Sequence, residues 1–291
     1  MIILRVQDWL ERYLIIERIL GLDAPFEFPD GFPYPVRQME DVEQAAIALR
    51  NSWQLGLDPI ATLVELLEER GLRVGVISGV EAFDGCAFEV EVGDCRQPVL
   101  VYADNYPGDR QRFSTAHELG HLMLRVEGNL DEEKVANRFA GAFLAPQPSV
   151  IRELAAMGST LTLSELAHLK QKYGMSMQAW VYRLRDLGVV SEWSASRVFA
   201  MFRERGWHKT EPGEPYPAES PRRFENLVLA AYEEEIITTS RASELLNMRY
   251  IEFLNRYQHL RGGASIALRR GHKRLDKSAQ GWHPARSAAA D

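Results

Sequence analysis

The chain contains 291 residues, of which 46% are hydrophobic, and it carries a formal net charge of −7 at pH 7. At about 150 residues per domain this length suggests two domains, and the apolar fraction is sufficient for hydrophobic cores. The acidic balance argues against a protein coated in nucleic acid. No apolar run approaches the length of a membrane span, so no membrane partner is expected.

Two further classes of protein are disfavoured. Cys86 and Cys95 are too few for a disulfide framework and are not spaced as a Cys-x-x-Cys site, so we expect two ordinary thiols in a reducing compartment. The first residues lack the apolar stretch of a signal peptide, because charged residues interrupt the sequence from Arg5 onward. We therefore expect a cytoplasmic protein.

Residues 1–55 are predicted to form an N-terminal helical arm. Apolar residues recur at helical spacing from Val6 to Leu20, a Pro- and Phe-rich connection follows, and a second helix is expected from Met39 to Gln54. A third helix is expected from Pro59 to Arg70, because proline is well placed in the first turn of a helix.

Three segments with strand composition follow, namely Leu72–Ile77, Cys86–Val92 and Pro98–Tyr102. Polar and apolar side chains alternate most clearly in the second. A small sheet is therefore expected ahead of the next helix. An exposed edge strand can pair with an extended peptide, and Val99–Tyr102 is our candidate for such an edge.

The next helix carries a metal-binding motif, His-Glu-Leu-Gly-His, inside the apolar pattern of Arg110–Leu124. Because helix positions four apart lie one above the other, His117 and His121 can reach one cation from the same face. Glu118 points about 100° round the axis, where it would hold a catalytic water without being a ligand. Gly120 is expected to leave room where a metal approaches the backbone. Burial of these groups for structural reasons alone is disfavoured, because uncompensated polar burial is costly.

A catalytic zinc usually takes three protein ligands, so a third donor is needed. The best source is the helix expected over Asp131–Pro146. For Asp131 and Glu132 we prefer an interpretation as charges that complement the helix dipole. Glu133 shares a face with small and apolar residues that would carry it inward, and Asn137, one turn on, would steady a ligand.

These segments resemble the ImmA/IrrE-type metallopeptidases. The matching residues are 110–121, 133–140 and 144–146, with further similarity upstream in 56–60 and 66–71 and weaker similarity downstream to about residue 190. Many relatives have a histidine where this chain has Arg125, and we assign that position no metal role.

The resemblance implies a set of roles. His117, His121 and Glu133 would be the metal ligands, and Glu118 would be the catalytic general base. The ligand types favour Zn²⁺, with Mn²⁺ as the alternative cofactor.

After Pro146 the pattern becomes entirely helical. Helices expected over Leu163–Tyr173 and Met177–Gly188, joined by a glycine-containing turn, have the layout of a helix-turn-helix, and Ser176 is expected to cap the second. The same layout is a common packing unit, and apolar positions such as Trp180 look like core. If this unit read DNA, its obvious contacts would be Gln178, Arg183 and Arg185.

The last third of the chain has three parts. Residues 206–221 have the composition of a linker, and residues 222–260 are expected to form a second small helical unit, again helix-turn-helix-like. Residues 261–291 contain seven Lys or Arg against two Asp, and are predicted to be a basic, disordered tail.

The sequence therefore predicts an α+β fold. A small zincin-like metallopeptidase domain, with a few-stranded sheet and active-site helices, would occupy residues 56–146. Helical, helix-turn-helix-like regions would flank it, the first of them an extension over residues 147–205.

The family resemblance implies a zinc-dependent endopeptidase that makes a site-specific cut in a helix-turn-helix repressor or similar regulatory partner, in a stress response or on induction of a mobile element. Two alternatives stay open. One is a DNA-binding regulator or antitoxin-like subunit that uses the zincin fold as a sensor or scaffold. The other is a subunit of a toxin–antitoxin complex whose protease is held inactive. The charge distribution favours protein over nucleic acid as the principal partner.

Overall fold

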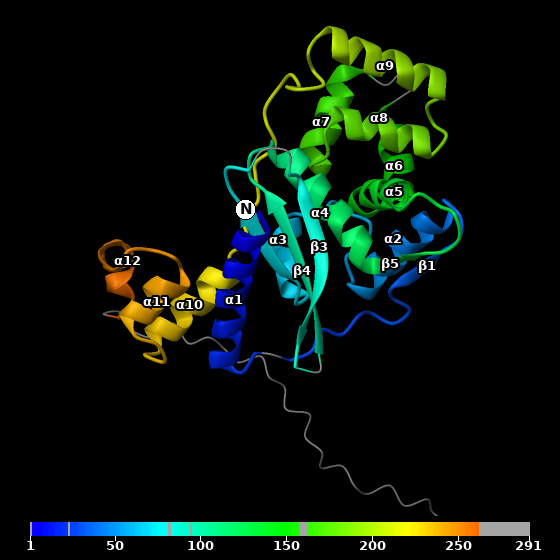
Figure 1. The fold of residues 1–291 in the computed structure, drawn as a ribbon. Helices are drawn as coiled ribbons and strands as arrows, with labels where there is room; N and C mark the ends of the chain where they lie inside the picture. The colour runs from blue at the N-terminus through cyan, green and yellow to red at the C-terminus, as the bar shows by residue number, and fades with distance from the viewer. Residues whose placement is uncertain (1, 23, 81–82, 94, 158–161, 262–291) are drawn as a thin grey trace, which may run out of the picture.

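The computed structural model describes residues 2–22, 24–80, 83–93, 95–157 and 162–261. Helices surround two small sheets (Figure 1), which confirms the predicted mixture of helices and strands. In chain order the elements are α1 (Ile2–Leu20), β1 (Tyr34–Val36), α2 (Asp41–Ser52), α3 (Leu63–Glu69), β2 (Arg73–Ile77), β3 (Gly85–Val92), β4 (Cys95–Ala103), α4 (Gly108–Met123), β5 (Leu124–Val126), α5 (Glu132–Leu144), α6 (Gln147–Met157), α7 (Leu163–Tyr173), α8 (Met177–Asp186), α9 (Glu192–Glu204), α10 (Arg223–Glu233), α11 (Thr239–Leu245), α12 (Tyr250–Tyr257) and a 3₁₀ turn (Gln258–Arg261).

The larger sheet has the strand order β2-β4-β3, with β2 parallel and β3 antiparallel to β4. The prediction that Val99–Tyr102 forms an edge is therefore wrong, because these residues lie in the central strand. Their composition explains the position, since Val99, Leu100 and Val101 are fully buried, as in strands covered on both faces. The strand beside them, β3, has no second partner among the described residues. The smaller sheet pairs β1 with β5.

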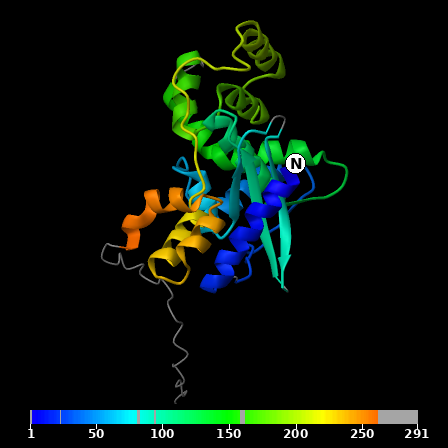
Figure 2. The same cartoon turned by 60° about the vertical axis from the view of Figure 1, so that its left-hand side comes forward.

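The two faces of the larger sheet contribute to different cores. Leu100 packs in the core shared with α3 and α4, whereas its neighbours Val99 and Val101 pack against α1, because successive strand residues point to opposite faces. Figure 2 shows α1 lying across the sheet. Gly75 permits this close approach, since a Cβ there would meet the Trp9 ring at 2.8 Å.

Helices α4 and α5 approach closely at Gly120. A Cβ at this position would lie 3.1 Å from the Phe139 ring and 3.3 Å from Ala136 Cα. The prediction that Gly120 gives a metal access to the backbone is therefore wrong, because its empty side faces α5. The close approach instead places the first turn of α5, which carries Glu133, beside the middle of α4.

Helices α6 to α9 form the helical extension. Ser176 caps α8 as predicted, by accepting a backbone N–H, and Trp180 is fully buried. Arg183 is only 1% exposed. Its Nη2 donates to Glu43 at 2.8 Å and its Nε to the Ala145 carbonyl at 2.9 Å. The suggestion that Arg183 contacts DNA is therefore wrong, because the guanidinium is used to join α8 to α2 and α5.

Residues 206–221, which we call the strap, connect α9 to α10 without helix or strand. Two carboxylates hold the strap to the rest of the molecule. Glu211 lies 2.9 Å from Lys170 Nζ, and Glu219 forms an ion pair with Arg112 of α4. The connection is therefore bound along its length by buried charge.

Helices α10 and α11 pack against α1, and α12 lies on their far side (Figure 1). Ile16 of α1 joins the same core as Val228 and Phe253. Arg223 Nη1 lies 2.6 Å from Glu17 of α1. Residues 262–291 of the predicted tail lie outside the described residues. Within the described part of the chain, the helices are too short or too polar to cross a membrane.

Candidate metal centre

Helix α4 carries both motif histidines on one face. His117 Nε2 and His121 Nε2 lie 3.1 Å apart, because four residues make just over one helical turn. The two rings meet edge to face, with 4.8 Å between their centroids. Both Nε2 atoms therefore border the same point in space.

The first turn of α5 brings Glu133 to this point. Its carboxylate oxygens lie 3.2 Å from His117 Nε2 and 3.5 Å from His121 Nε2. Asp131 starts α5 by accepting the N–H of Lys134. The Glu133 side chain is 71% exposed, so the expectation that α5 carries it inward is wrong. It stands at the open side of the site, where a helix's first turn has no preceding turn to cover it.

The three donors fit a divalent metal. They all lie within 4.8 Å of one another, and the contacts between them measure 3.1 to 3.5 Å. Ligands about 2.1 Å from a tetrahedral ion would be about 3.4 Å apart. Two imidazoles and one carboxylate are also a ligand set of catalytic zinc sites. The structure thus brings together His117, His121 and Glu133 in a geometry able to hold a metal.

Asn137 fixes the orientation of His117. Its Oδ1 lies 3.1 Å from His117 Nδ1, an arrangement in which Nδ1–H donates and Nε2 keeps its lone pair for a metal. Burial lowers the pKa of His117, and the neighbouring His121 adds to this effect. The imidazole is therefore held in the neutral form that binds metals. As predicted, Asn137 contacts a candidate metal ligand, and this ligand is His117.

Glu118 is half-buried beside these three residues. Burial raises the pKa of Glu118 to about 7, the charges of Glu133 and Asp84 act in the same direction, and a hydrogen bond with the Ala87 backbone opposes them. The carboxylate lies close against Gly85, where a Cβ would be 3.1 Å from Glu118 Cγ. A carboxylate with a pKa near neutrality is well suited to accept and return a proton.

A cavity of about 590 Å³ contains all these groups. One wall is the beginning of β3 and the other is one face of α4. Among its lining residues are Asp84, Gly85, Cys86, Ala87, Arg110, Phe113 and Ser114. Burial raises the pKa of the Cys86 thiol. The ligand group found among the described residues consists of His117, His121 and Glu133 and does not include Cys86.

Sequence reasoning missed the contribution of β3. Asp84 and Gly85 lie more than thirty residues before the motif, and they reach it only because β3 pairs with β4 beside α4. The local signal was an Asp-Gly pair, which indicates a turn and nothing about a metal.

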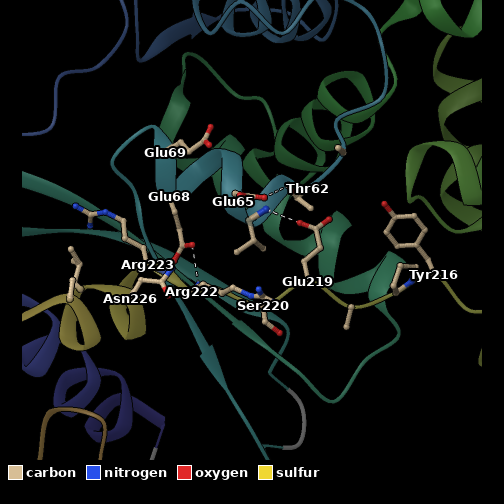
Figure 3. A pocket seen from close by; sticks show the side chains of 16 residues that line it. Thr62, Glu65, Glu68, Glu69, Tyr216, Glu219, Ser220, Arg222, Arg223 and Asn226 are labelled. Atoms are coloured by element: carbon tan, nitrogen blue, oxygen red, sulfur yellow. Dashed lines mark hydrogen bonds between the residues drawn. The ribbon is translucent and has the colours of Figure 1, made fainter. Parts of the chain in front are cut away.

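A second cavity, of about 910 Å³, lies between α3, the strap and α10 (Figure 3). Two of its carboxylates accept hydrogen bonds from the first residues of helices or the residue before them. Glu68 accepts the backbone N–H groups of Arg222 and Arg223, and Glu219 accepts that of Val64. These acids are therefore committed to holding the strap and α10 in place.

The paired histidines, the carboxylate from the next helix and the half-buried glutamate together form an arrangement that can hold a metal and place a carboxylate beside it. Residues 79–185 match the family model of peptidase M78, described as the IrrE N-terminal-like domain. This match confirms the resemblance of residues 79–185 to the ImmA/IrrE-type peptidases. The match runs from just before β3 into α8 and contains the whole candidate site. No curated protein matches the chain.

Proposed function

We propose that this protein is a metal-dependent endopeptidase, with zinc as the metal that its ligand types suit best. The observation that carries the proposal is the convergence of His117, His121 and Glu133 beside a half-buried Glu118 in one cavity. The peptidase family match over the same residues supports it.

Each residue has a distinct role in the proposed reaction. His117, His121 and Glu133 would hold the metal. When bound, the metal would polarise the scissile carbonyl and lower the pKa of the attacking water. Glu118 accepts the proton from that water and returns it to the leaving amine. Its raised pKa, about 7, allows both transfers near neutral pH.

The substrate is proposed to lie as an extended segment along β3. This strand has no partner on its outer side among the described residues, and its first residues line the cavity. Antiparallel pairing is the more common and slightly more stable arrangement. In that direction, the residues after the scissile bond lie on the side of Asp84.

A helix-turn-helix regulator is proposed as the protein that is cut. The support is the ImmA/IrrE resemblance, together with the acidic balance of the chain, which disfavours DNA as the main partner. The burial of Arg183 removes one of the residues on which the DNA-binding alternative depended.

The proposal is tested by comparing protein termini in cells that express the wild type or Glu118→Gln. Both proteins are first shown to be folded and metal-loaded. New termini should arise at one or a few sites with the wild type and be absent with the variant. Identical sets of termini from two metal-loaded proteins would overturn the proposal.

A further inference from the structure

Arg110 stands in the same cavity as the metal centre, two helical turns before His117. Seven residues at about 1.5 Å each place the two Cα atoms about 10 Å apart on one face of α4. The Arg110 side chain lines the cavity and is 51% exposed. The positive charge of Arg110 therefore faces any peptide segment that binds in this cavity.

The surroundings of Arg110 hold the guanidinium in place. It lies over the Tyr106 ring, 3.8 Å from the centroid. Its Nη2 donates to both oxygens of Asp84, at 3.0 and 2.9 Å. Asp84 also takes part in a side-chain hydrogen bond with Tyr106. The Asp84 carboxylate thus takes part in hydrogen bonds with both Arg110 and Tyr106. Nε and Nη1 of Arg110, by contrast, have no hydrogen-bond partner among the described residues.

The free N–H groups of Arg110 match a carboxylate oxygen. The planar forks of a guanidinium pair Nη2 with either Nε or Nη1. Because Nη2 already donates to Asp84, an Asp or Glu side chain of the substrate would accept from Nε or Nη1 and share Nη2 with Asp84. The stacking on Tyr106 and the bond to Asp84 fix the plane beforehand, so less side-chain entropy is lost on binding. The other acids of the cavity, Glu118 and Glu133, belong to the metal centre.

The distance along α4 locates the substrate position. An extended peptide advances about 3.3 Å per residue, so about 10 Å corresponds to three residues. With the substrate antiparallel to β3, Arg110 lies beside the residues that follow the scissile bond, on the side of Asp84.

We propose that Arg110 is a specificity-determining residue that selects substrates with Asp or Glu at the second or third position after the scissile bond. The inference rests on the proposed peptidase function and adds the substrate class. Because Arg110 is half-exposed and already paired with Asp84, the pair should favour the acidic side chain over its amide by roughly 2- to 5-fold in kcat/KM.

The test uses a synthetic peptide library that varies the residues on both sides of the cut, with cleavage read by mass spectrometry. Metal-loaded wild type is compared with Arg110→Gln, Arg110→Lys and Asp84→Asn. Arg96→Gln is the matched control, because Arg96 is also an exposed arginine beside an acid, 3.6 Å from Glu89, on the same sheet.

The expected pattern separates specificity from structure. The wild type and Arg96→Gln should prefer an acid over its amide, Arg110→Gln should lose this preference, and Arg110→Lys should keep part of it. Asp84→Asn should strengthen the preference, because it removes the charge that competes for Arg110. If the Arg110–Asp84 pair had a structural role alone, Arg110→Gln and Asp84→Asn would change the acid preference in the same direction and would lower Tm by similar amounts.

Three results would overturn the inference: cleavage without an acid preference after the cut, a preference that persists in Arg110→Gln, or the same shift in Arg110→Gln and Asp84→Asn. No cleavage by the metal-loaded wild type would overturn the proposed function, and this inference with it.

Discussion

Replacing Glu219 with alanine should destabilise the whole domain, because it leaves a buried arginine without its carboxylate. Arg112 and Glu219 have side chains that are 1% and 13% exposed. After the change Arg112 would keep only backbone carbonyls, those of Tyr173 and Ile60. The start of α3 would also lose the acceptor for Val64 N–H, now 2.7 Å away (Figure 3).

The size of the effect follows from this burial. Removing one partner of a buried ion pair typically costs about 3–5 kcal/mol, because the remaining charge has no compensation. For a chain of this size that loss corresponds to a fall in Tm of roughly 6–15 °C. Glu219→Gln, which keeps the shape and one hydrogen bond, should cost less.

Thermal unfolding followed by circular dichroism measures the effect. Glu214→Ala is the control, because Glu214 is an exposed acid in the same strap, and only its backbone carbonyl makes a bond. The Arg112→Met single variant and the double variant complete a cycle that isolates the pair. A Tm for Glu219→Ala equal to that of Glu214→Ala would refute the reasoning, because the strap would then not be anchored by this charge.

Three other changes test the metal centre directly. Metal analysis of His121→Ala should show loss of the ion, while Glu132→Ala should keep it; equal loss would mean that the wrong carboxylate is assigned. Because burial raises the pKa of Glu118 and only the deprotonated form is a base, kcat/KM should fall as pH is lowered through that pKa; a flat profile down to pH 5 would contradict this role. Gly85→Ala should lower both kcat and Tm, because its Cβ meets Glu118 Cγ and the Val101 backbone carbonyl at 3.1 Å each; full activity would show that Glu118 tolerates displacement.

The parts of the fold that the sequence predicted well are those set by local periodicity. The apolar spacing of α4 and α5 indicated both helices, and the four-residue spacing of His117 and His121 placed both imidazoles on one helical face. Ser176 was predicted as a cap because a serine side chain satisfies N–H groups within its own turn. Each of these depends on residues a few positions apart.

The errors concern contacts between distant segments. Nothing local distinguishes a central from an edge strand with certainty, although the all-apolar run Val99–Val101 favours a central strand. Gly120 was assigned to function by its residue type, and Arg183 was named as a DNA contact on the condition that its helical unit reads DNA. Their surroundings, α5 for Gly120 and Glu43 for Arg183, come from other parts of the chain.

On the proposed function, the cavity also limits what can be cut. From Arg110 to His121 the face of α4 spans about 16 Å, the length of about five residues of extended chain. A substrate helix has its backbone groups paired internally, so it cannot pair with the edge of β3. The bound segment must therefore be a loop, a linker or a helix that has unfolded locally. If the substrate is a helix-turn-helix regulator, as proposed, its DNA-reading unit is itself helical, and the cut would fall in the segment that joins this unit to the rest of the protein. One hydrolysed bond there would separate the DNA-reading helices from the remainder and so end repression.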